Sequence, residues 1–179
     1  MDKRDYIIIG LLVVIIAMLA YGVYNSYVDS QPEVFDLGDF KVTGPAGSHY
    51  HQEINATVFF LGDNESMPIF EIGTLDSSNG GPNVFKEMIN SYNKGEISKS
   101  ELIKLLNEDS DMKSFKVLDF NVGDFRGEPE ASILCQNPYD GTKTLLIHII
   151  LHNNDKGFLV IEFMDNPVST SMYNSLILK

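Results

Sequence analysis

The chain opens with one long apolar segment and continues as a sequence whose hydrophobic period changes along its length. Residues 6–28 carry no charged side chain, and their isoleucine, leucine and valine residues leave no continuous polar stripe. As a helix, this run is long enough to cross the roughly 30 Å hydrocarbon core of a bilayer. The pattern predicts a membrane span over 6–28, a linker over 29–33 and a folded domain over 34–179.

The charges on either side of this span predict its direction. Lys3 and Arg4 precede it, whereas acidic residues follow it and the next basic residue is Lys41. Basic residues favour the cytoplasmic side of a membrane. We therefore expect residues 1–5 inside the cell, with the span acting as a signal anchor and the large domain outside.

A cleaved signal peptide is the competing interpretation of the same segment. Ala20, Tyr21 and Gly22 place small residues at the spacing that signal peptidase accepts, so cleavage after Gly22 stays open. The apolar run nevertheless continues to Val28 without a polar region, which favours an uncleaved anchor. The only cysteine, Cys135, lies far from the span, which excludes a lipoprotein and an internal disulfide.

Beyond the linker, the pattern predicts an α+β domain. Apolar runs and alternating runs predict strands over 34–43 (one strand or a strand pair), 54–61, 69–75, 115–121, 130–136, 143–152 and 158–164. Loops rich in turn-forming residues join the last three strands, so we expect these strands to be antiparallel neighbours. Within 130–136 the alternation indicates one buried face that includes Cys135, with Glu130 on the opposite face.

Helical spacing of apolar residues appears in the middle and at the end of the domain. Pro82 suits the first position of one helix, and Ser98 with Glu101 forms a capping box for a second. Only residues 93–96 separate them, which predicts a tight helical hairpin, and Pro167 begins a C-terminal helix. The expected fold is a mainly antiparallel sheet packed by a central helical hairpin and a C-terminal helix.

Composition limits the possible partners. The chain has 179 residues with 13 Lys+Arg against 25 Asp+Glu, a net charge of -12. Nucleic acid is excluded as an expected partner because phosphate binding draws on clustered positive charge. The expected partners are the lipid bilayer, through residues 6–28, and a neighbouring membrane protein complex or a cell-envelope component.

Candidate chemistry is sparse and centres on histidine. His49 and His51 share a face of an extended segment, and with Glu53 they would offer three metal-ligand side chains. No second cluster in the sequence completes a metal site, so we assign no metal, cofactor or catalytic residue. In the strand over 143–152, His148 and His152 also share a face, where a half-buried histidine near a sheet edge is expected.

Two further features bear on chemistry and modification. Cys135 lies on the apolar face of its strand, where a thiol is normally inert, and the sequence has no Gly-x-Ser-x-Gly motif for a serine nucleophile. Asn55 and Asn64 both begin glycosylation sequons. Asn64 is the better acceptor because it lies in a predicted turn, whereas Asn55 adjoins a strand.

The C-terminal third of the chain resembles the PsbP-like family. The resemblance lies in residues 127–131 (Gly-Glu-Pro-Glu-Ala) ahead of a strand, in two strands joined by a short turn over 143–164, and in a terminal helix closing with residues 172–177. It implies an extracytoplasmic binding or accessory domain without catalytic residues. The alternative is an extracytoplasmic metal-dependent sensor or hydrolase that uses the region of His49, His51 and Glu53.

Overall fold

The computed structural model describes residues 18–19, 30–62, 68–75, 81–108, 115–136, 141, 144–152, 156–164 and 166–179. The predicted membrane span over 6–28 lies outside this set except for Met18 and Leu19. Among the helices that are described, none is long and apolar enough to cross a membrane. The described chain folds as α+β, with antiparallel sheets and the helices α2, α3 and α4.

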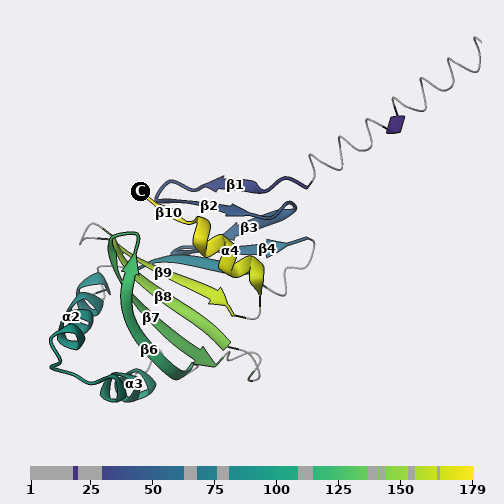
Figure 1. The fold of residues 1–179 in the computed structure, drawn as a ribbon. Coiled ribbons are helices and arrows are strands. Elements are labelled where there is room, and N and C mark those ends of the chain that lie inside the picture. The colour runs from purple at the N-terminus through teal and green to yellow at the C-terminus, as the bar shows by residue number, and fades with distance from the viewer. Residues whose placement is uncertain are drawn as a thin grey trace, which may run out of the picture.

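A seven-stranded antiparallel sheet forms the centre of the fold (Figure 1). Its strands, in spatial order, are β3 (Ser48–Gln52), β4 (Ala56–Leu61), β5 (Phe70–Leu75), β9 (Lys156–Phe163), β8 (Thr144–His152), β7 (Glu128–Gln136) and β6 (Lys116–Phe125). The predicted antiparallel pairing of the last three strands is confirmed, since β8 pairs with β7 on one side and β9 on the other. Strand β8 is therefore an interior strand, which explains its buried residues on both faces.

One face of this sheet is covered by α2 (Gly81–Asn93) and α3 (Lys99–Glu108). Ile89 and Leu102 enter an apolar core with alternate residues of β7 and β8, among them Cys135. The predicted capping box is confirmed: Ser98 N–H donates to Glu101 Oε2 (2.9 Å) and Glu101 N–H donates to Ser98 Oγ (3.3 Å).

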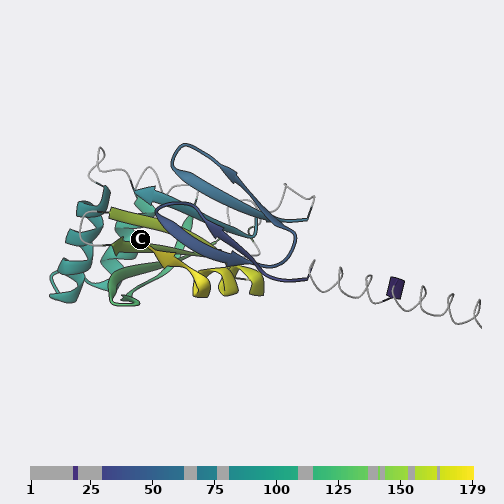
Figure 2. The same ribbon diagram turned by 90° about the horizontal axis from the view of Figure 1, so that it is seen from above.

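The other face packs against α4 (Pro167–Ser175) and a small three-stranded sheet, as Figure 2 shows from above. This sheet consists of β1 (Glu33–Asp36), β2 (Phe40–Gly44) and β10 (Ile177–Leu178), with β2 in the middle. Residues with little or no exposed surface form this second core, including Val42, Phe59, Phe158 and Met172.

Three features differ from the expected fold. Strand β3 was not among the predicted strands, although His49 and His51 were placed on an extended segment, and β10 was not expected at all. The two middle helices do follow each other through a short connection, but α2 packs across β7, β8 and β9 whereas α3 packs along β6. They therefore cover different strands instead of forming the predicted tight hairpin.

Candidate functional site

A buried histidine lies near the centre of the large sheet, on the face that α4 covers. His148 is 5% exposed, and its neighbours in the pairing register are Ser132 on β7 and Val160 on β9. Side chains two residues apart on a strand share a face. Glu130 and Glu162 therefore lie diagonally on either side of His148, and both are also buried.

Both ring nitrogens of His148 contact a carboxylate. Nδ1 forms a hydrogen bond with Glu130 Oε1, and Nε2 lies 3.3 Å from Glu162 Oε2. An ionised carboxylate only accepts hydrogen bonds, so each ring nitrogen must donate. This geometry fits an imidazolium cation between two carboxylate anions. We use the name His148 cluster for His148, Glu130, Glu162, Tyr173 and Thr170.

Helix α4 supplies the remaining partners of the two carboxylates. The Tyr173 hydroxyl donates to Glu130 Oε1 (2.7 Å), and the Thr170 hydroxyl donates to Glu162 Oε1. The helix is held at its start by Asn166, whose side chain accepts from Val168 N–H (3.0 Å). The position of α4 therefore brings two hydroxyl groups into contact with the buried carboxylates of the sheet.

The His148 cluster shifts the pKa of each ionisable member. Burial alone would lower the pKa of His148, but the adjacent Glu130 and Glu162 raise it above its ordinary value. Burial alone would raise the pKa of Glu130 and Glu162, but the hydrogen bonds from His148 and from the two hydroxyl groups lower both below their ordinary value. Burial and the charge of Glu130 together raise the pKa of Tyr173.

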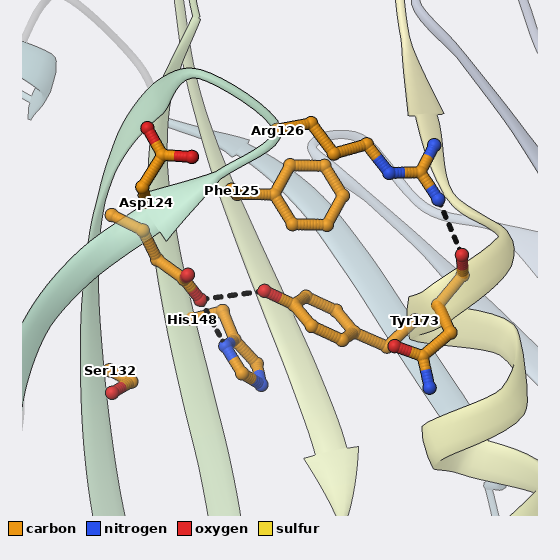
Figure 3. A pocket seen from close by; sticks show the side chains of 8 residues that line it. Asp124, Phe125, Arg126, Ser132, His148 and Tyr173 are labelled. Atoms are coloured by element: carbon orange, nitrogen blue, oxygen red, sulfur yellow. Dashed lines mark hydrogen bonds and ion pairs between the residues drawn. The ribbon is translucent and has the colours of Figure 1, made fainter.

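A pocket of about 390 Å³ opens beside the His148 cluster (Figure 3). Its lining residues are Asp124, Phe125, Arg126, Glu130, Ser132, His148, Tyr173 and Asn174. They come from β6, β7, β8, α4 and the hairpin between β6 and β7. The pocket therefore lies where the tip of that hairpin meets the last turn of α4.

The hairpin tip has a backbone conformation that places Arg126 over this pocket. Arg126 (φ 54°) and Gly127 (φ 95°) both have positive φ, the pattern of a type I′ turn. The guanidinium group of Arg126 donates through Nη2 to the Asn174 carbonyl oxygen and lies 5.3 Å from the ring centroid of Phe125. Figure 3 shows the Arg126 side chain extending from the hairpin toward α4.

The first predicted histidine pair, His49 and His51, does not line this pocket. His49 and His51 lie on β3 and share a face as expected, with ring centroids 5.9 Å apart and both rings against Phe60. Glu53 follows the strand and is exposed. Within the described part of the chain, no three His, Cys, Asp or Glu side chains gather in a way that could hold a metal ion.

The prediction for the second histidine pair was partly wrong. His148 and His152 do share a face of β8, but His148 is buried in the interior of the sheet because its strand is flanked on both sides. His152 Nδ1 lies 3.1 Å from Glu128 Oε1. Glu130 was assigned to the face opposite the buried one, and that face is instead covered by α4.

The two remaining candidates are also located. Cys135 is fully buried, and burial raises its pKa to about 11, in agreement with an inert thiol. Asn55 is exposed in the structure, contrary to the expectation that the neighbouring strand shields it, and Asn64 lies outside the described residues.

No protein-family model matches the chain, and no curated protein matches it. The resemblance to the PsbP-like family stays a prediction.

Proposed function

We propose that the chain is a single-pass, membrane-anchored extracytoplasmic binding or accessory domain, and that the pocket beside the His148 cluster is its binding site. The anchor and its direction rest on the uncharged run over 6–28 and on the charge asymmetry around it. The pocket joins one charged rim to a buried polar floor, and convergent polar groups of this kind fix the orientation of a small ligand.

The mutual engagement of the buried ionisable groups carries the choice of binding over catalysis. Both nitrogens of His148 contact carboxylates, and the hydroxyl of Tyr173 donates to Glu130. A histidine general base needs a ring nitrogen with an available lone pair, and neither nitrogen of His148 offers one. A nucleophile needs an adjacent base. The raised pKa of Tyr173 also opposes its use as a phenolate nucleophile. The His148 cluster is therefore suited to form the rigid floor of a binding pocket.

The metal-dependent alternative would need a third ligand beside His49 and His51. The described residues bring none to them. The apolar ring of Phe60, against which both imidazoles pack, supports a structural role for this pair.

A crosslinking pull-down from native membranes tests the proposed function. The full chain and a His49→Ala, His51→Ala double variant are each expressed in intact cells, crosslinked and recovered. We expect the same membrane partner with both proteins, with and without a chelator. Loss of every partner with the double variant would overturn the proposed binding domain in favour of a site at His49 and His51.

Topology is measured on the same cells. External protease should digest the region after residue 29 and leave the N-terminus intact. Digestion of residues 1–5 alone would show that the proposed orientation is wrong.

A further inference from the structure

The pocket beside the His148 cluster presents opposite charges on two of its sides. Asp124 and Glu130 come from the neighbouring strands β6 and β7, whereas Arg126 comes from the hairpin tip above them. Figure 3 shows Asp124 and Arg126 on either side of the Phe125 ring, with His148 and Tyr173 below. A ligand in the pocket therefore meets carboxylates and a guanidinium group together.

The acidic side keeps hydrogen-bonding capacity for a ligand. Glu130 is 9% exposed and uses Oε1 for both His148 and Tyr173, while its Oε2 accepts no hydrogen bond from the described residues. Asp124 uses Oδ1 to accept from Gly127 N–H (2.7 Å), and its second oxygen is likewise without a partner among those residues. Two carboxylate oxygens are thus available to a donor cation.

The basic side has spare donors as well. Arg126 uses one N–H for the Asn174 carbonyl, and a guanidinium group carries five. Among the described residues, no carboxylate forms an ion pair with Arg126. The contact with Phe125 and the hydrogen bond to α4 hold the group in place, so its remaining donors are positioned for a carboxylate.

These charges discriminate between ligand classes. A simple anion at Arg126 would lie near Asp124 and Glu130, and a simple cation at those acids would lie near Arg126; both meet like-charge repulsion. A molecule that carries both charges avoids this cost on each side. We propose that the pocket binds a small zwitterion, with its ammonium group at Glu130 and Asp124 and its carboxylate at Arg126.

This inference rests on the proposed function, because a binding domain leaves its ligand unchanged. The detergent-solubilised full chain is titrated by calorimetry with glycine, 4-aminobutyrate and 6-aminohexanoate, which differ in charge separation. Butylamine and butyrate are the matched single-charge probes. We expect one zwitterion to bind about tenfold more tightly than either single-charge probe, since it gains a second charged contact. Equal affinity for a single-charge probe, or no binding of any probe, would overturn the inference.

Three variants assign the charges. Arg126→Gln should weaken zwitterion binding about tenfold because the carboxylate contact is lost, and it should strengthen butylamine binding because the like charge is removed. Asp124→Asn should weaken binding of the zwitterion and of butylamine, because both place an ammonium group at this carboxylate. Asp124 is exposed, so the substitution leaves the buried His148 cluster intact. Lys94→Gln, a change at an exposed lysine after α2, is the control and should leave every affinity unchanged. Equal zwitterion affinity in Arg126→Gln and wild type would contradict the proposed placement of the ligand carboxylate at Arg126.

The fate of the bound molecule separates the two proposals. NMR of the recovered probe should show it unchanged. Conversion to a product would overturn the proposed binding function while keeping the ligand class, whereas absent zwitterion binding with an intact pull-down would overturn the ligand class alone.

Discussion

The ring of Tyr173 lies nearly parallel to the imidazole of His148, with ring centroids 4.0 Å apart and an interplanar angle of 19°. The same tyrosine donates its hydroxyl hydrogen to Glu130, so one side chain of α4 contacts both the cation and one of its anions. An aromatic face over a cation stabilises the charged form. Docking of α4 and charging of His148 are therefore coupled.

Replacement of His148 tests the balance of charge in the cluster. His148→Gln leaves Glu130 and Glu162 buried without their cation, so we expect a loss of about 3–5 kcal/mol in the free energy of unfolding at pH 7. The loss should shrink as the pH falls, because protonation relieves the two carboxylates. Urea unfolding at pH 7 and pH 4 measures both. His51→Gln, on the exposed edge strand β3, is the control; equal losses in the two variants would contradict the prediction.

The pH dependence of wild-type stability follows from the same shifts. The raised pKa of His148 gives stability that is complete below its ordinary value of 6.5 and is lost as the pH rises through the folded-state value. The lowered pKa of Glu130 and Glu162 gives stability that is complete above 4.5 and is lost as the pH falls through their folded-state values. Stability should peak between pH 4.5 and 6.5. Urea unfolding should show the alkaline loss in wild type and not in His148→Gln.

The hairpin tip offers a test of backbone conformation without a change in packing. A Cβ atom at Gly127 would meet no atom within 4 Å, but φ there is +95°. Gly127→Ala should therefore destabilise the fold by about 1–2 kcal/mol through backbone strain alone. Gly123→Ala on β6 is the matched control, because that position is equally open and lacks a positive φ. Urea unfolding should separate the two; equal effects would count against the turn.

The buried thiol should be chemically silent in the folded protein. With its pKa raised to about 11, Cys135 stays protonated at pH 8 and is shielded from reagents. A chromogenic disulfide reagent should label the chain only after denaturant is added. A Ser100→Cys variant, exposed on α3, should add one fast-reacting thiol and confirm that the reagent is active. Fast labelling of the wild type in native buffer would contradict the burial.

Local signals were sufficient for most elements of the fold. The strand over 130–136, the antiparallel pairing of the last three strands and the capping box at Ser98 each depend on residues close in the chain, and each is confirmed. Strand β10 escaped because its pairing partner on β2 lies far away in sequence, with Ile177 opposite Lys41. Its two residues carry no pattern of their own.

The sequence did not predict the His148 cluster for a related reason. Alternation placed Glu130 opposite the buried face of its strand, and nothing nearby shows that α4 covers that second face. The contacts join residues 18 and 14 positions apart, across strand registers that the sequence does not specify. One signal was present: His148, Glu130 and Glu162 each interrupt or adjoin apolar strand residues. Such interruptions indicate buried polar partners when both faces of a strand are apolar.

Closure of the small sheet has a consequence for biosynthesis. Strand β2 lies early in the chain, yet its pairing with β10 needs residues from the C-terminal end. The hydrogen bond from Thr43 N–H to Ser175 Oγ (2.8 Å) likewise joins residues 132 positions apart. Phe40 and Val42 share their core with Met172 of α4, so their apolar surface is fully covered only after α4 has been synthesised. The apolar core around β2 is therefore complete only after the C-terminal residues of the chain have been added.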